Sequence, residues 1–254
     1  MQGTSTITPI KEVQIKGTVL MRLRQRKNQS WINNINVYDV FCGDGENIIC
    51  DETVQGSPLE ICDAINESGM DAAFIASDIK HLSVMALCPM LKAKANTDLF
   101  THKRYSAEKA KATDQMDKII CYLKKSKGNH AIIIVDPNGP GVMPFDKMLY
   151  IMKHHSKQAD MLINISETAI NRILGCHITK DKNWWEKYDS FVEIIWSILA
   201  TCKCGWIRTP IKGDRQRWRF ICCWSFAPPL HNWEKQGLFE VRSKDDLVQM
   251  IGVK

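Results

Sequence analysis

Three short apolar runs of the sequence each end in residues that could do chemistry. The first leads into the glycine turn Gly43-Asp44-Gly45, the second is closed by Asp78, and the third is followed by Asp136-Pro137-Asn138-Gly139. Glycines allow a tight turn and let a ligand lie directly on the backbone, while carboxylates accept hydrogen bonds from a sugar hydroxyl or an amine. These three ends are the candidate site of the chain.

Each of the three ends also has a purely structural explanation. The glycine pair suits a plain turn, and Asp78, a carboxylate that could accept hydrogen bonds from both hydroxyls of a ribose, suits a helix N-cap. The segment after Asp136 suits a turn-rich loop. Together they favour function, because a glycine turn, a ribose acid and an Asp-Pro turn follow one another in the order expected of one nucleoside-binding cleft. Ligands of open parallel sheets bind beyond the carboxyl ends of the strands.

Hydrophobic periodicity and punctuation predict alternating strands and helices. The predicted strands cover Asn36–Cys42, Ala72–Ser77, Leu99–Tyr105, His130–Val135 and Asp160–Ile165, with a last hairpin of Gly205–Pro210 and Arg217–Phe226. The predicted helices cover Ser57–Glu67, Leu82–Leu91, Ala107–Lys125, Phe145–His155, Thr168–Leu174 and Trp185–Ala200. Ser57 is expected to cap the first helix with Pro58 at its first position, and Pro89 is expected to limit the second.

Strands of near-continuous apolar character that alternate with helices imply a parallel sheet covered on both faces. The expected fold is therefore α/β, a doubly wound, mostly parallel sheet with a C-terminal antiparallel hairpin. A basic N-terminal segment is expected over residues 1–30 and a single domain over residues 31–254. Glu46–Gln55 lies where a lid over the cleft would sit, and the sequence leaves that role open.

The composition excludes a disordered chain, a collagen and a coiled coil. The chain has 254 residues, 44% of them hydrophobic and 24% charged, which is ordinary for a folded globular protein. No apolar run reaches about 18 residues, and the N-terminus lacks the layout of a signal peptide, so we expect no membrane partner. The ten cysteines lack the paired spacing of a zinc site, so we expect no metal and reduced thiols in a cytoplasm.

The net charge of +6 is concentrated in two stretches. Residues 11–27 carry six basic side chains against one acid, Glu12, and residues 203–219 carry six against Asp214. Charge gathered in this way suits a polyanion partner such as a nucleic acid, although a basic face is often only solvated.

The segment Tyr38–Gly45, followed by Asp78 and Asp136-Pro137, resembles the class I, Rossmann-like S-adenosylmethionine-dependent methyltransferases. Within it, Phe41-Cys42-Gly43-Asp44-Gly45 resembles the Phe-x-Gly-x-Gly form that is common in nucleic-acid methyltransferases. Asp136-Pro137 resembles the start of the Asp-Pro-Pro-aromatic motif of enzymes that methylate exocyclic amines.

Two further segments, Gly45–Ile65 and Asp160–Arg172, are similar to the three-Cys-motif partner proteins of bacteria and their phages. One departure bears on the acceptor. Asn138-Gly139 stands where the amine enzymes have Pro-aromatic, so the aromatic residue that stacks on a flipped base is absent from its usual place.

The resemblance implies S-adenosylmethionine as the cofactor. The glycine turn would hold its methionine part, Asp78 its ribose, and Asp39 its amino end, directly or through water. The residues implied in cofactor binding are Asp39, Phe41, Cys42, Gly43, Asp44, Gly45 and Asp78. The implied catalytic residues are Asp136, Pro137 and Asn138; the Asp136 carboxylate and the Pro137 carbonyl would accept hydrogen bonds from the target amine.

The leading hypothesis is methyl transfer to a nucleic acid, with the adenine N6 amino group of DNA as the favoured acceptor. Its base must be flipped out or single-stranded to reach the cleft. The residues expected to contact the nucleic acid are Arg24, Arg26, Arg215, Arg217, Arg219 and Trp184. The alternatives are RNA, a protein or a small molecule as acceptor, or non-catalytic binding of a nucleotide or nucleic acid in a phage or defence system. The oligomeric state is left open.

Overall fold

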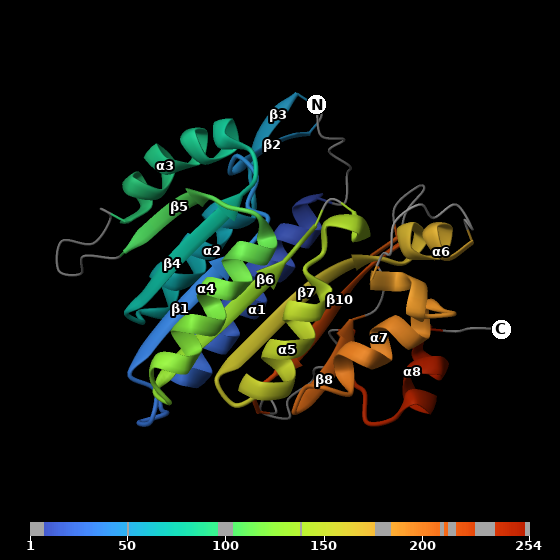
Figure 1. Cartoon of the computed structure of the whole chain (residues 1–254). Coiled ribbons are helices and arrows are strands. Elements are labelled where there is room, and N and C mark those ends of the chain that lie inside the picture. Colours follow the sequence, from blue (N-terminus) through green and yellow to red (C-terminus); the bar gives the residue numbers. More distant parts are fainter. Residues whose placement is uncertain are drawn as a thin grey trace. The chain divides into compact units, whose positions relative to one another are not determined.

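The computed structural model describes residues 8–49, 51–95, 104–137, 139–175, 184–208, 211–212, 217–226 and 237–251. The chain divides into two compact units, Met1–Asp136 and Pro137–Lys254. In Figure 1 the first unit runs from blue to green and the second from yellow to red. The three acids singled out in the sequence, Asp39, Asp78 and Asp136, all belong to the first unit.

The first unit is built on a parallel sheet with the strand order β6-β1-β4-β5. Its strands are β1 (Asn34–Asp39), β4 (Ala72–Asp78), β5 (Tyr105–Lys109) and β6 (Asn129–Val135). From β1 the chain proceeds to β4 and β5 on one side and then returns to β6 on the other. The order therefore reverses between β1 and β6, and a switch point of this kind is where open parallel sheets bind their ligands.

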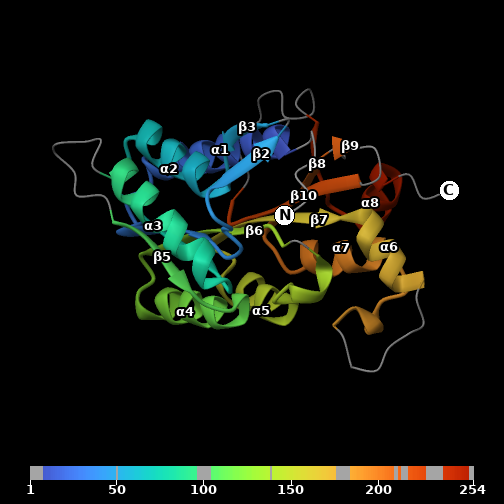
Figure 2. The same cartoon turned by 90° about the horizontal axis from the view of Figure 1, so that it is seen from above.

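In the described part of the first unit the helices are α1 (Thr8–Arg26), α2 (Ser57–Ser68), α3 (His81–Ala95) and α4 (Ala112–Lys125). Figure 2 shows α1 and α2 on one face of the sheet and α4 on the opposite face. Helix α1 packs on α2 with a fully buried stripe of Ile15, Val19 and Leu23, four residues apart. This spacing places the three side chains on one side of the helix, so burial of that side fixes how α1 lies.

The second unit holds antiparallel strands in the order β11-β8-β10-β7, with β9 paired to β10. They are β7 (Ala159–Ser166), β8 (Cys204–Arg208), β9 (Ile211–Lys212), β10 (Arg217–Trp224) and β11 (Leu238–Glu240). Its helices are α5 (Phe145–His155), α6 (Glu167–Gly175), α7 (Phe191–Leu199) and α8 (Lys244–Ile251), with 3-10 turns η1 (Pro140–Val142) and η2 (Trp184–Lys187). The α/β fold with a parallel sheet and a C-terminal antiparallel hairpin, here β8 and β10, is confirmed.

Several predicted boundaries are wrong for local reasons. The strand predicted over Leu99–Tyr105 is β5, which begins only at Tyr105, and residues 96–103 lie outside the described part of the chain. The helix predicted from Ala107 begins at Ala112, because the residues before it pair with β4. Helix α3 continues through Pro89 to Ala95 instead of stopping there.

Two predicted helix starts are also corrected. Gly56, not Ser57, is the N-cap of α2, and the Ser57 hydroxyl is directed to Asp39 instead. The single helix predicted over Trp185–Ala200 is divided into η2 and α7, because Ser190 caps α7 by accepting a hydrogen bond from the Glu193 amide at 3.2 Å. Within the segment predicted as a possible lid, β2 (Glu46–Ile49) and β3 (Glu52–Gln55) pair as antiparallel strands.

Gly56 is where the start of α2 meets the glycine turn. Its amide donates to the Gly45 carbonyl at 2.7 Å, and a Cβ at position 56 would lie 3.0 Å from the carbonyl carbon and oxygen of Gly45. These are backbone atoms, which cannot yield without moving the turn. We expect Gly56→Ala to lower the free energy of unfolding by about 1–3 kcal/mol, measured by urea denaturation.

Gly17→Ala is the matched control. Gly17 lies exposed within α1, and a Cβ there would meet nothing within 4 Å. Alanine should therefore stabilise the protein by up to about 1 kcal/mol through helix propensity. A Gly56→Ala variant as stable as the wild type would contradict the close packing of the two segments.

Candidate functional site

The carboxyl ends of β1, β4 and β6 bring Asp39, Asp78 and Asp136 to one edge of the parallel sheet. The turn after β1 is tied to the end of β4 by two backbone donors. The Cys42 amide donates to the Ser77 carbonyl at 3.0 Å, and the Gly43 amide donates to Asp78 Oδ2 at 3.1 Å. The first two predicted strand ends are thus in direct contact.

The glycine turn has the bare backbone expected of a ligand cradle. Gly43 and Gly45 have positive φ angles of 62° and 89°, which glycine adopts without the strain that other residues meet. A Cβ on Gly45 would lie 2.7 Å from Leu87 Cδ1, whereas a Cβ on Gly43 would meet nothing within 4 Å. Position 45 is therefore closed on the side of α3, while position 43 faces open space.

Asp78 links the turn to the start of α3. Its Oδ1 accepts from the Lys80 amide at 2.8 Å, and its Oδ2 accepts from Gly43. The helix itself begins at His81, so Asp78 holds the loop that precedes α3. Each carboxylate oxygen has a second lone pair, and the residue is only partly buried. The carboxylate is therefore able to accept further hydrogen bonds from a diol.

Ile79 was missed by sequence reasoning. It follows Asp78 directly and is 59% exposed, which is unusual for so large an apolar side chain. An exposed apolar side chain beside the predicted ribose acid offers a surface on which a flat ring can lie. Its position immediately after a strand-ending acid was the signal available in the sequence.

Asp39 is fully buried at the end of β1. Its Oδ2 accepts from the Ser57 hydroxyl at 2.8 Å and its Oδ1 from the Phe41 amide at 3.2 Å. Burial raises the pKa of Asp39 to about 7; the two hydrogen bonds lower it, and the charge of Asp136 raises it. The carboxylate fixes the turn to α2, and near neutral pH it exists in both protonation states.

Helix α1 adds two charged residues that the sequence prediction assigned only to a basic segment. The Lys11 ammonium lies 2.7 Å from Asp136 Oδ2. Glu12 is 5% exposed, and burial raises its pKa to about 8, with Lys11 opposing the shift and Asp136 and Asp39 adding to it. Its Oε2 finds no hydrogen-bond partner in the described part of the chain. As the one acid among six bases in this stretch, Glu12 carried a signal that was not used.

The remaining predicted cofactor and catalytic residues differ in how far they are exposed to solvent. Phe41 is half-buried and Asp44 is exposed, both in the turn. Cys42 is 4% exposed, and burial raises the pKa of its thiol, so it is a packing residue in this structure. Pro137 is buried and begins the second unit, and Asn138 lies outside the described residues.

The predicted nucleic-acid residues are only partly on the surface. Arg26 and Arg219 are 1% and 2% exposed, so neither presents its guanidinium to a polyanion. Arg24 is exposed and pairs with Glu67 at 3.2 Å, and the Arg217 side chain is 48% exposed. Arg215 lies outside the described residues. The basic residues from Arg22 to Arg26 lie in the last turns of α1, which ends at Arg26.

Trp184 packs within the second unit. Its ring stacks on Phe145 with centroids 4.2 Å apart and planes at 7°, and its indole N–H donates to the Pro140 carbonyl at 3.0 Å. One ring face and the polar atom are therefore engaged inside the protein. The side chain is partly exposed, so the expected contact with a nucleic acid stays a prediction.

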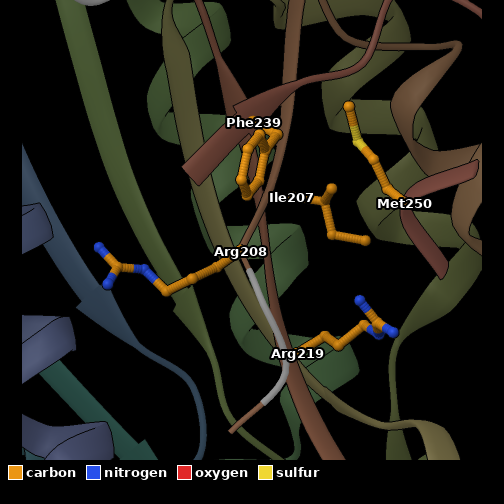
Figure 3. Close-up of a pocket in the computed structure, with 5 residues that line it drawn as sticks. All are labelled: Ile207, Arg208, Arg219, Phe239 and Met250. Carbon is orange, nitrogen blue, oxygen red and sulfur yellow. The ribbon is translucent and has the colours of Figure 1, made fainter. Parts of the chain in front are cut away.

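A pocket of about 330 Å³ lies in the second unit, lined by Ile207, Arg208, Arg219, Phe239 and Met250. Its two arginine side chains extend in opposite directions (Figure 3), and Arg219 Nε pairs with Glu167 at 2.8 Å. The two cations therefore do not converge on a common point, and the pocket lacks the arrangement of an anion site.

No family model matches the chain, and no curated protein matches it. Among solved structures, protein LPL1258 from Legionella pneumophila has a TM-score of 0.51 at 10% identity, over 87% of this chain and 86% of that one. Trm1 from Pyrococcus horikoshii, solved with S-adenosyl-L-methionine, has a TM-score of 0.49 at 11% identity, and the match covers 86% of this chain and 56% of Trm1. Magnesium protoporphyrin IX methyltransferase from Synechocystis, with bound SAH, has a TM-score of 0.41 at 12% identity, and the match covers 82% of this chain and 80% of that enzyme.

The likeness to the Legionella protein covers most of both chains, and at 10% identity it shows a shared fold and nothing about activity. The strand order and the acids at the switch point define the class of this protein as Rossmann-like α/β. Among the described residues, no helix is both long and apolar enough to cross a membrane. Within that same part of the chain, no three His, Cys, Asp or Glu side chains are grouped to hold a metal ion.

The hydrogen bond between Ser57 and Asp39 should stabilise the protein in a pH-dependent way. The pKa of Asp39 is raised from 3.8 to about 7 by folding, so the buried carboxylate lowers stability progressively between pH 3.8 and 7, and above pH 7 it is charged in the folded protein. The hydroxyl offsets that cost by donating to the charged form. We expect Ser57→Ala to lower the free energy of unfolding by about 1–3 kcal/mol at pH 8 and by clearly less at pH 5, measured by urea denaturation.

Ser68→Ala is the matched control, because Ser68 is equally buried at 7% exposure but donates to a neutral carbonyl, that of Ile65, at 2.7 Å. Its loss should be the same at both pH values. A loss for Ser57→Ala that does not change with pH would show that Asp39 is not charged against this hydroxyl.

Proposed function

We propose that the protein is an S-adenosylmethionine-dependent methyltransferase that acts on a nucleic acid, with the adenine N6 amino group of DNA as the acceptor. One observation carries the proposal. Asp39, Asp78 and Asp136 end three neighbouring parallel strands around the switch point, with a bare glycine turn beside them. This is the position at which a sheet of this class binds a nucleoside.

The residues at this edge fit the proposed cofactor. Position 43 leaves open space above the backbone, so a ligand is able to approach the turn closely. Three acids, the buried Glu12 and Asp39 and the partly buried Asp136, lie near the single ammonium of Lys11. S-adenosylmethionine carries both a sulfonium and an ammonium, so it suits an edge rich in carboxylates. When bound, it supplies a methyl group on a sulfonium, which needs no metal for activation.

Within the cleft each side chain has a separate task. Asp78 accepts hydrogen bonds from the ribose hydroxyls while it keeps the Gly43 amide in place. Ile79 covers one face of the adenine ring of the cofactor with its exposed side chain. Asp39 fixes the turn through Ser57, and its carboxylate would supply negative charge to the methionine part of the cofactor.

Asp136 is the residue that would bind the acceptor amine. Its Oδ2 already binds a nitrogen, the Lys11 ammonium, at 2.7 Å, so its geometry suits an amine donor. A target amine would donate to this oxygen in place of Lys11, and this hydrogen bond would orient the nitrogen lone pair for methyl transfer. Asp136 also lies where it can take the proton that the nitrogen loses. The rate gain would come mainly from positioning.

The nucleic-acid acceptor is supported by the net charge of +6 and by the exposed arginines Arg24 and Arg217. The choice of adenine in DNA rests on the resemblance at Asp136-Pro137. A base must leave its stack to reach the edge of the sheet, so single-stranded DNA should be the better substrate at low salt.

A second candidate function is cofactor binding without methyl transfer. The Lys11–Asp136 ion pair favours it, because a permanent ion pair would keep an acceptor amine away from Asp136. The two candidates differ in what Asp136 is needed for. An enzyme requires it for turnover, whereas a binding protein does not.

The test is methyl incorporation from labelled S-adenosylmethionine into duplex DNA, single-stranded DNA and RNA, together with calorimetric binding of S-adenosylhomocysteine. We expect label in DNA that digests to N6-methyladenosine. Asp136→Ala should lower turnover by about 100-fold or more while it leaves the affinity for S-adenosylhomocysteine within about threefold, because the lost contact is made to the acceptor.

Asp71→Ala, at an exposed position before β4, is the control and should change neither quantity. Label in RNA alone would move the acceptor to RNA. Cofactor binding without label in any acceptor would favour the binding protein. No binding of S-adenosylhomocysteine would overturn both candidates.

A further inference from the structure

Helix α1 brings two neighbouring charged residues to the edge where β1 and β6 end. The Lys11 ammonium is engaged with Asp136 Oδ2 at 2.7 Å. Glu12 is more deeply buried than Lys11, with 5% of its surface exposed. It faces Lys11 on its own helix, Asp39 and Asp136 at the strand ends, and Glu60 on α2.

The acids around Glu12 are already supplied with donors. Asp39 accepts from the Ser57 hydroxyl and the Phe41 amide. Asp136 accepts from Lys11, and Glu60 lies 3.9 Å from the ammonium of Lys16. By contrast, Glu12 Oε2 has no hydrogen-bond partner within the described ranges. A buried acceptor without a donor is costly, so this oxygen marks a place that a ligand group can complete.

The ligand group that best suits the ionised form of Glu12 is a cation, because an alkylammonium donates a hydrogen bond and neutralises the carboxylate charge at once. The aromatic amine of a nucleobase is uncharged at neutral pH and does not meet this need. The amino-acid end of S-adenosylmethionine does, because its amine is an alkylammonium.

We propose that Glu12 binds the ammonium group of the cofactor's amino-acid end, so that α1 supplies a carboxylate in addition to those at the strand ends. The assignment rests on the proposed function. It makes Glu12 a residue that distinguishes a nucleoside carrying an amino acid from one that lacks it.

A proton must leave when this contact forms. Burial raises the pKa of Glu12 to about 8, so in the free protein at pH 7 the carboxyl is mostly protonated. An ammonium binds the ionised form, so binding at pH 7 should release close to one proton from Glu12. The affinity should rise between pH 6 and 8, a range in which the ligand amine keeps its charge.

The experiment is calorimetric titration with S-adenosylhomocysteine and with 5′-methylthioadenosine, which has the same nucleoside and sulfur but no amino acid. Titrations in buffers of different ionisation enthalpy give the number of protons released. In the wild type, S-adenosylhomocysteine should bind about tenfold or more tightly than methylthioadenosine, and it alone should release the proton.

Glu12→Gln is close in shape to the protonated residue and should fold. It should lower the affinity for S-adenosylhomocysteine about tenfold, lose most of the proton release, and leave methylthioadenosine binding unchanged. Glu60→Gln is the matched control: it removes a neighbouring carboxylate that lies against Lys16, and it should retain both the preference and the proton release.

The outcomes distinguish a failure of the role of Glu12 from a failure of the proposed function. Equal weakening of both ligands by Glu12→Gln, or no weakening of either, would overturn the role of Glu12 and leave the proposed function standing. Wild-type protein that binds neither ligand would overturn the proposed function, and this inference with it. If Glu12→Gln does not fold, the proton release of the wild-type protein tests the role of Glu12. Equal proton release with S-adenosylhomocysteine and with methylthioadenosine would contradict that role.

Discussion

The buried carboxylate of Asp39 is the constraint on which the candidate site depends. Because it accepts from both Ser57 and Phe41, it joins the end of β1, the glycine turn and the start of α2. The turn is then held from its other side by Asp78, which accepts from the Gly43 amide. A charged group has been placed where burial opposes its charge, and such an arrangement is more typical of a site than of a stabilising contact.

Helix α1 gives this edge its particular chemistry. A helix that only covered the sheet would need no more than its buried stripe of Ile15, Val19 and Leu23. One turn before that stripe, Lys11 pairs with Asp136, and Glu12 Oε2 has no hydrogen-bond partner among the described residues. An edge with more buried acid than base favours positively charged ligands, and this agrees with a sulfonium cofactor.

The sequence predicted the central strands well because their apolar runs are continuous, and β6, buried along its whole length, was placed to within one residue. It failed at β5, an edge strand of polar and small residues that carries no comparable pattern. The position of Asp39, Asp78 and Asp136 at one edge of the sheet could be predicted because each closes a strand, while their roles stay predictions. The burial of Glu12, Arg26 and Arg219 was not foreseen, because the sequence pattern does not show which charged side chains are buried.

The most direct test of the central claim is hydrogen exchange of the intact protein with and without S-adenosylhomocysteine. We predict slower exchange of the backbone amides at residues 41–45 and 78–80 and in the first turns of α1, with little change elsewhere in the first unit. Absence of protection at the glycine turn, with protection confined to the second unit or found nowhere, would contradict the assignment of the cleft.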